Sequence, residues 1–423
     1  MTATRPAFRD ANVLRWLGAY TTSVTGDVAY FMALSWATAR VAGPAQVGVV
    51  LAVGAIPRAV LMLGGGVLAD RFGPRRVLIG SDLVRCGVLL GAAVATWVGG
   101  PQLWLLYALS VLFGVVDAVF MPAVGALPPR LTDQGQLARV QGMRVLAVRF
   151  SNAVGPLVGS FALAVVGAAG AFAVVGALFG VSLGLLSAVR TKPVVATVVA
   201  TAVGERGLEP APHRSGPVES DPPRALSADL RDGLRYLRGH RRLRRLVWVI
   251  ALGEMCFSGP LAAGLVLLAD ERKWDAAALG WILAAFSVGG AVSALATAAA
   301  RRVPRAGVVL AVSLAVTAGL VTVLGRATTP GSAVVLSGFL GAVSGVAMVL
   351  GNALLQKEAE PRYLGRVTSV TTLGTLGLSP LLFPLTGLAA ALWGTATFFA
   401  GCGAICVLAA ATALTSSLRG ARL

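Results

Sequence analysis

The sequence predicts an all-α membrane protein of twelve transmembrane helices in two six-helix bundles, with both chain termini in the cytoplasm. An apolar composition, twelve long apolar segments and a one-sided distribution of basic residues lead to this prediction. Of the 423 residues, 56% are hydrophobic and 13% are charged, whereas a soluble domain carries about 25% charged residues. Apolar segments this long satisfy their backbone polar groups in lipid only as helices, so we reject a soluble helical core.

A membrane span needs about 20 consecutive apolar residues, and twelve segments reach that length. The predicted spans are 13–40, 46–69, 77–98, 102–124, 142–165, 168–189, 245–269, 276–299, 306–325, 331–355, 366–392 and 394–417. Six spans therefore lie in an N-terminal bundle, residues 1–190, and six in a C-terminal bundle, residues 245–423. Residues 191–244 between them form a cytoplasmic linker, in which leucines at helical spacing over 226–238 predict an amphipathic helix on the membrane surface.

Most of the basic residues behind the net charge of +18 lie in the connections between spans. Thirty of the 36 Lys and Arg residues fall on one side of the twelve-span arrangement, including four from Arg130 to Arg149, and four fall on the other side. Arg58 and Arg85 lie within spans. This asymmetry places both termini in the cytoplasm. It excludes nucleic acid as a partner and predicts contact with the anionic headgroups of the lipid bilayer.

Other function classes lack the residues that they need. The four cysteines all fall within spans and predict neither a disulfide framework nor a metal site. No lysine follows a glycine, so the phosphate-binding loop of an ATP-driven pump is absent. The two histidines, His213 and His240, lie in the linker, and no metalloprotease or serine-hydrolase motif occurs. We therefore expect no enzyme activity, no cofactor and no metal.

A short charged turn joins the second and third predicted spans. Its gate-motif residues are Gly66, Asp70, Arg71, Gly73, Arg75 and Arg76. The glycines permit a tight reversal, and the arginines hold the loop in the cytoplasm. The stretch resembles the loop between helices 2 and 3 of the major facilitator superfamily, G-x-L-A-D-R-x-G-R-R, with Pro74 where the family usually has a basic residue. This resemblance implies two halves that rock around a midplane site; we expect a monomer.

The fifth predicted span carries a pattern of small residues. Its members are Gly142, Gly155, Pro156 and Gly159. The pattern resembles the antiporter motif of exporting branches of the superfamily, G-x8-G-x3-G-P-x2-G-G, with serines at two of the glycine positions. Small residues let helices approach closely, and proline bends the span; ordinary packing is the alternative.

Segments 128–139, 229–237 and 361–367 are similar to those of the bacterial drug and siderophore exporters, the group of the macrolide efflux and enterobactin exporters.

Of the charged residues within spans, four predict the transport site, because each costs at least about 2.5 kcal/mol in lipid. They are Asp27, Arg58, Asp117 and Glu254. The resemblance implies that helices 1, 4, 7 and 10 line a central cavity, and the three acids fall on that set. One arginine cannot neutralise three acids, so we expect at least one acid to bind a proton, with Glu254 as first choice and Asp27 as second. A structural ion pair with Arg58 is the alternative for the acid that it contacts.

Aromatic residues accompany these acids at helical spacing. They are Tyr20, Tyr30, Phe113, Phe120 and Phe257. Acids and aromatic rings together suit a small amphipathic organic substrate or drug, including a cationic one. We therefore predict a secondary transporter in the cytoplasmic (inner) membrane of a bacterium, exporting its substrate against protons by alternating access. An importer or a lysophospholipid flippase of the same superfamily is the alternative, and transport direction in inverted vesicles separates these.

The gate motif yields a first testable prediction. Asp70 is the single acid among three arginines at a helix end, where we expect it to stabilise the outward-facing state across the cytoplasmic gate. Asp70→Asn should preserve expression and reduce transport several-fold, measured as uptake into membrane vesicles per amount of protein. A well-expressed Asp70→Asn protein that transports at the wild-type rate contradicts this interpretation.

Overall fold

The computed structural model describes residues 7–132, 134–189, 235–257, 260–299, 305–359 and 380–414. Within these ranges the side chains at 7, 63–70, 134–135, 138, 254, 256–257, 260, 262 and 298–299 are not described. Residues 191–234 of the predicted linker 191–244 and residues 366–379 of the predicted span 366–392 lie outside the described residues. Every regular element within the described ranges is helical, which confirms the all-α prediction.

The N-terminal half contains five helices. They are α1 (Ala11–Ala42), α2 (Pro44–Phe72), α3 (Pro74–Gly99), α4 (Leu103–Ala126) and α5 (Gln134–Ser187). Short 3-10 turns cover Ala7–Arg9 and Pro128–Arg130. Gly167 interrupts α5 with a positive φ of 67°, a conformation open to glycine. The break separates two rods that match the predicted spans 142–165 and 168–189.

The C-terminal half follows the linker. Its helices are α7 (Arg241–Phe257), α8 (Pro260–Glu271), α9 (Ala276–Ala299), α10 (Ala306–Leu324), α11 (Pro330–Glu358), the helix Pro380–Trp393, and α13 (Thr395–Ala413). The single predicted span 245–269 is covered by α7 and α8 within the described residues, and positions 258–259 between these two helices lie outside the description.

The turns between helices explain why Pro74 replaces a basic residue of the family pattern. Gly73 has φ 82°, and Pro74 is the first residue of α3, where its missing N–H costs no hydrogen bond. The same Gly-Pro pair, Gly43 and Pro44, separates α1 from α2. Arg75 then donates a hydrogen bond to the carbonyl oxygen of Ser187 at 2.7 Å, which fastens the start of α3 to the end of α5.

Apolar side chains cover the outside of both halves, as a lipid-facing surface requires. Val98 is 85% exposed and Leu295 is 63% exposed. Eight helices within the described ranges are long and apolar enough to cross a membrane, and Pro380–Trp393 is a shorter apolar helix. The chain is a multi-pass membrane protein.

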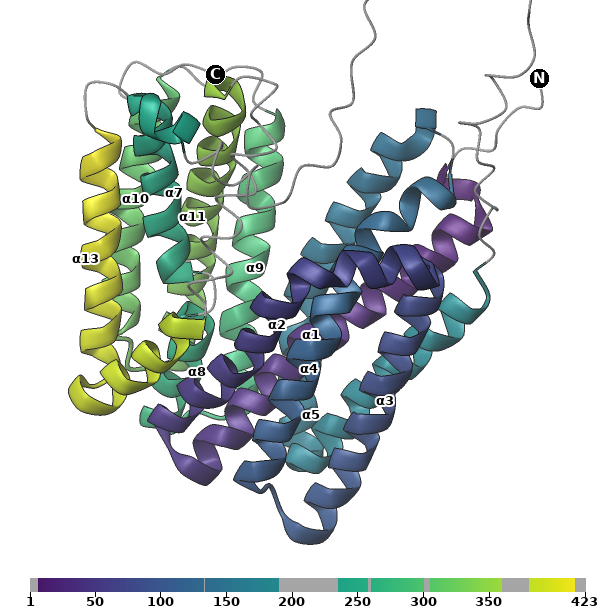
Figure 1. Cartoon of the computed structure of the whole chain (residues 1–423). Helices are drawn as coiled ribbons and strands as arrows, with labels where there is room; N and C mark the ends of the chain where they lie inside the picture. The colour runs from purple at the N-terminus through teal and green to yellow at the C-terminus, as the bar shows by residue number, and fades with distance from the viewer. Residues whose placement is uncertain are drawn as a thin grey trace, which may run out of the picture.

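The two halves stand side by side and meet at the end of the molecule remote from the chain termini (Figure 1). The helix Pro380–Trp393 packs closely on the start of α2, since a Cβ added to Gly387 would lie 2.8 Å from the carbonyl oxygen of Pro44. Helix α1 also contacts α8 across the halves. At the opposite end, which holds both termini, the ribbons of the halves diverge (Figure 1).

Helix α5 packs on α1 within its own half and on α9 of the other half. On the α1 side, a Cβ added to Gly155 would lie 2.7 Å from Val28 Cβ, and one added to Gly159 would lie 3.1 Å from Ala29 Cα. On the α9 side, a Cβ added to Gly280 would lie 2.9 Å from the carbonyl oxygen of Pro156. The small residues therefore serve close helix contacts on two faces of α5.

The close α1–α5 contact makes Gly155→Leu strongly destabilising. The added side chain meets Val28 and the carbonyl oxygen of Thr25, so the helices must separate, at a cost of about 1–3 kcal/mol. A fluorescence-detected melting curve of the detergent-purified protein should show a clearly lower Tm. Gly142→Leu is the matched control, because this glycine of α5 has no atom within 4 Å of its added Cβ. Equal Tm values for the two variants would contradict the packing argument.

Candidate functional site

A buried arginine, Arg85 of α3, forms the centre of the N-terminal half. Its side chain is fully buried, and three aspartates surround it. Arg85 Nη2 donates a hydrogen bond to Asp117 Oδ1 of α4. Arg85 Nη1 lies 3.5 Å from Asp27 Oδ1 of α1 and 3.8 Å from Asp82 Oδ1, one turn earlier on α3. One guanidinium thus connects three helices.

The three aspartates are held unequally. Asp82 accepts hydrogen bonds from Ser23 Oγ at 3.2 Å and Ser182 Oγ at 2.6 Å. Asp117 contacts two guanidinium groups, because Arg58 Nη1 of α2 lies 3.8 Å from its Oδ2. Asp27 Oδ1 has no hydrogen-bond donor within the described part of the chain. Asp27 is therefore the least restrained carboxylate of the cluster.

The charges of this cluster do not balance. With every group ionised, Asp27, Asp82 and Asp117 oppose Arg58 and Arg85, so one negative charge is left over. Binding of one proton makes the cluster neutral. The sequence predicts Arg58 as the single base of the transport site; the structure adds Arg85 and Asp82. A local signal existed, since the two residues are three apart within the predicted span 77–98 and thus share a helix face.

Aromatic rings enclose the Arg85 guanidinium. Its carbon Cζ lies 4.3 Å from the ring centre of Phe120, 5.3 Å from that of Phe179 and 5.8 Å from that of Phe113. Tyr30 stacks on Phe113 with ring centres 3.6 Å apart. Such cation–π contacts stabilise a desolvated cation. Phe113, which is 2% exposed, also lines the cavity described below, whereas Phe120, which is 3% exposed, does not line it.

Five expected site residues lie away from the charged cluster or outside the described side chains. Tyr20 is buried against Trp16, two turns from Asp27, and Arg144 Nε lies 3.4 Å from its hydroxyl. The side chains of Glu254 and Phe257 on α7 are outside the described residues, as are those of Gly66 and Asp70 in the gate motif. Arg71 and Arg76 of that motif are exposed.

The charged cluster opens into a cavity between the halves. This cavity has a volume of about 480 Å³ and is lined by Tyr30, Arg58 and Asp117 from one half and by Phe286 and Phe383 from the other. The Arg58 side chain is 28% exposed and that of Asp117 is 7% exposed. The cavity is large enough for a small organic molecule and mostly apolar, with charge at one wall.

No group of three metal-ligating side chains occurs within the described ranges. Two bundles of apolar helices around a shared cavity with buried charges are the architecture of a membrane transporter. Comparison with known families agrees: the sequence profile of the Major Facilitator Superfamily matches residues 16–384. The chain belongs to this superfamily, and it is a transporter rather than an enzyme.

Two curated relatives of low sequence identity are exporters. The multidrug efflux pump Tap of Mycobacterium tuberculosis is 27% identical over 375 residues, covering 86% of this chain and 84% of its own. The enterobactin exporter EntS of Escherichia coli is 24% identical over 380 residues, covering 87% and 82% of the two chains. The exporter resemblance found in the sequence is thus confirmed as a similarity.

Solved transporters share the fold. The nucleoside transporter NupG superposes with a TM-score of 0.67 at 12% identity, covering 95% of this chain and 98% of its own. A bacterial homologue of the iron transporter ferroportin in an inward-facing state gives a TM-score of 0.65 at 17% identity, covering 96% and 99%. Both comparisons support the major facilitator fold.

The central position of Arg85 leads to a stability prediction. Arg85→Gln leaves three buried carboxylates without their shared cation, which should lower the free energy of unfolding by about 3–5 kcal/mol. The measurement is the yield of monodisperse protein and its Tm in detergent. Arg58→Gln is the matched comparison and should cost much less, because the Arg58 side chain is partly exposed to the cavity. An Arg85→Gln protein as stable as the wild type would refute the central role.

Proposed function

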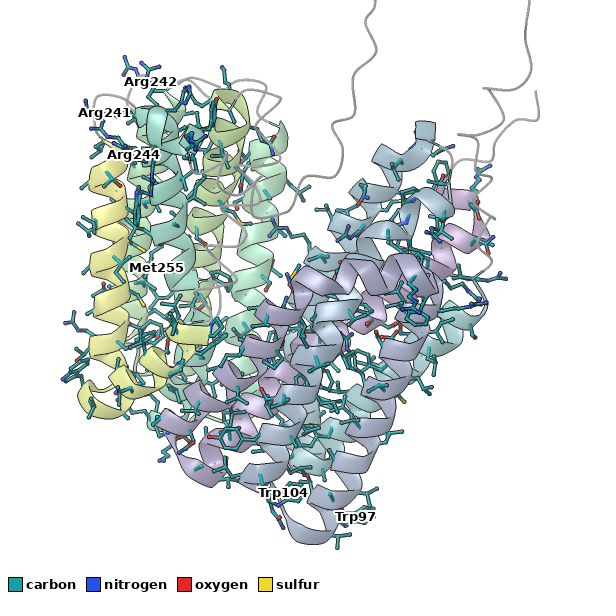
Figure 2. The ribbon with its side chains drawn as sticks, viewed as in Figure 1. Trp97, Trp104, Arg241, Arg242, Arg244 and Met255 are labelled. Carbon is teal, nitrogen blue, oxygen red and sulfur yellow. The ribbon has the colours of Figure 1, made fainter. Side chains whose placement is uncertain are left out.

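We propose that the protein is a twelve-span, proton-coupled exporter of a small amphipathic compound or drug in the cytoplasmic membrane of a bacterium, with both termini in the cytoplasm. The exporters among its relatives support the direction of transport. The end of the molecule that holds the chain termini also carries Arg241, Arg242 and Arg244, while Trp97 and Trp104 lie at the other end (Figure 2). This placement of cations supports the cytoplasmic assignment.

The unbalanced charge cluster is the observation that carries the proposed coupling. One proton neutralises the cluster. Asp27 is its least restrained carboxylate, so protonation of Asp27 breaks the fewest existing contacts. Sequence reasoning favoured Glu254 and placed Asp27 second; the geometry of the described residues favours Asp27. A proton on Asp27 weakens its attraction to Arg85, which strengthens the hold of Arg85 on Asp117 and Asp82. Protonation of Asp27 thereby changes the ion pairs of Asp117, which contacts Arg58 at the cavity wall.

Alternating access would follow from the way the halves meet. With cytoplasmic termini, the described state is closed on the outer side and diverges toward the cytoplasm (Figure 1). The close approach of α5 to α9 at Gly280 provides a contact about which the halves can rock. In the inward-diverging state the compound enters from the cytoplasm, and proton binding from outside follows its release.

A resistance panel in an efflux-deficient bacterial host is the first test, because it identifies a transported compound and its direction. The compound is then used in proteoliposomes with a pH gradient as the only energy source. Asp27→Asn should abolish accumulation against the gradient of the compound while preserving its exchange across the membrane. Asp117→Asn and Glu254→Gln are measured in parallel, since sequence reasoning also names these acids.

Asp275→Asn is the matched control for these variants. Asp275 Oδ1 accepts a hydrogen bond from Ala278 N at the start of α9, and asparagine serves equally well as such a cap. This control should accumulate the compound like the wild type. If Asp27→Asn, Asp117→Asn and Glu254→Gln all still concentrate the compound, coupling through a single acid is wrong.

A further inference from the structure

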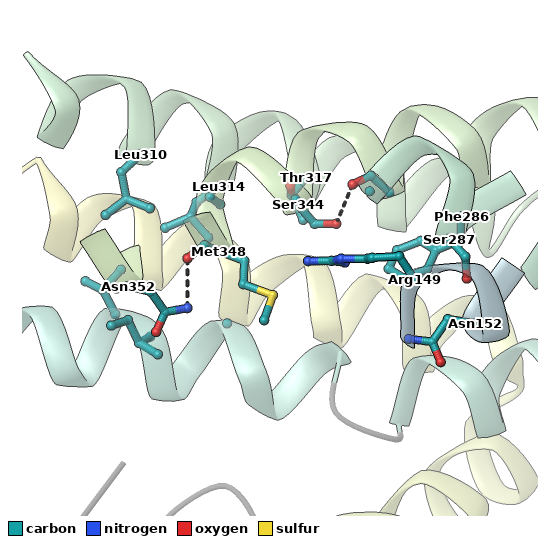
Figure 3. A pocket seen from close by; sticks show the side chains of 17 residues that line it. Arg149, Asn152, Phe286, Ser287, Leu310, Leu314, Thr317, Ser344, Met348 and Asn352 are labelled. Atoms are coloured by element: carbon teal, nitrogen blue, oxygen red, sulfur yellow. Dashed lines mark hydrogen bonds between the residues drawn. The ribbon is translucent and has the colours of Figure 1, made fainter. Parts of the chain in front are cut away.

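A second cavity lies between the halves, and Arg149 of α5 extends into it. The cavity has a volume of about 270 Å³, and α7, α9, α10 and α11 form its far wall. The Arg149 guanidinium is directed toward Met348 (Figure 3). Arg149 Nη1 lies 4.0 Å from the position of a Cβ added to Gly290 of α9, so the side chain crosses from one half to the other. The charge count had assigned Arg149 to a cytoplasmic connection; the structure corrects this placement.

The charge of Arg149 is unmatched. Within the described part of the chain, Arg149 has neither an ion pair nor a hydrogen bond, and it is the one charged side chain among the residues lining this cavity. Arg58 and Arg85, by contrast, both contact carboxylates. A cation in a mostly apolar cavity is costly, and a ligand with a negative charge would remove that cost.

The two walls of this cavity differ in the hydrogen-bond donors that they offer near Arg149. Asn152, one turn further along α5, lines the same cavity with its amide. On the facing helices, the hydroxyls of Ser287 and Ser344 donate to backbone carbonyls of their own helices at 3.0 Å and 3.3 Å. The N-terminal half therefore supplies the charged donor Arg149 and the amide of Asn152 to this cavity, and the C-terminal half supplies an apolar wall with neutral polar groups.

We propose that Arg149 and Asn152 bind an anionic oxygen group of the transported compound, such as a carboxylate, sulfonate or phosphate. The apolar body of the compound lies against Ile250, Phe286 and Met348. Asn152 and Phe286 also line the larger cavity, so the compound can extend from Arg149 toward Asp117. The description of this ligand as the transported compound rests on the proposed export function.

A pair of fluorescent probes of matched shape tests the site. N-dansyl-phenylalanine carries a carboxylate, and N-dansyl-phenylalanine amide is neutral. Each is titrated into the full-length protein in a neutral detergent, and Kd is read from the dansyl fluorescence. A guanidinium–carboxylate contact should make the Kd of the acid at least about tenfold lower than that of the amide. Arg149→Gln should remove the difference, and Arg149→Lys should retain part of it, because lysine keeps the charge without the planar fork.

Arg139→Gln is the matched control for the overall positive charge of the protein. Arg139 is an exposed arginine of the same helix and does not line the cavity, so this variant should keep the preference for the acid. The proposal is overturned if wild-type protein binds the acid no more tightly than the amide, including the case in which it binds neither. It is also overturned if the preference persists in Arg149→Gln.

A titration in nanodiscs distinguishes two possible sources of the anionic group, a transported solute and a lipid headgroup. The titration is repeated in phosphatidylcholine nanodiscs with and without phosphatidylglycerol. Unchanged binding of the acid supports a solute, whereas its displacement by phosphatidylglycerol overturns the solute assignment in favour of a lipid. A protein that keeps the Arg149-dependent preference but fails to export in proteoliposomes refutes the proposed function and leaves the anion site intact.

Discussion

The ion pairs of Arg85 are the interaction on which the rest of the N-terminal half depends. A charge inside an apolar bundle is tolerated only when it has partners, and those of Arg85 come from α1 through Asp27 and from α4 through Asp117. Ser182 and Phe179 add contacts from α5. A shift of any of these helices along its axis or about it would separate the charges, so the cluster sets the relative positions of four helices.

The two halves differ in the chemistry that they bring to the shared cavities. Within the described part of the C-terminal half, the buried polar side chains are hydroxyls, such as Ser293, Thr317 and Ser337. Among the described residues that line the cavities, the charged ones, Arg58, Asp117 and Arg149, come from the N-terminal half. Under the proposed function, the N-terminal half therefore recognises charge, while the described part of the C-terminal half provides an apolar surface that moves relative to it.

Helix α5 takes part both in the packing between helices and in the placement of charge in the cavities. Gly155 and Gly159 bring it against α1, close to Asp27, while Pro156 approaches Gly280 of α9. The same helix carries Arg149 into the second cavity. Under the proposed function, this direct packing is the route by which a shift of α1 would reach the helix that contacts the other half and holds the proposed anion site.

The sequence by itself determined the all-helical fold, most helix boundaries and the superfamily, because apolar length, Gly-Pro breaks and loop motifs are local properties of the chain. It also identified Asp27, Arg58 and Asp117 as interior charges, through the cost of burying them. Only the tertiary structure decided that Arg85 joins them and that Arg149 lies in a cavity. Those contacts depend on how helices distant in the chain are rotated and aligned against one another, and that arrangement is set by many packing contacts acting together.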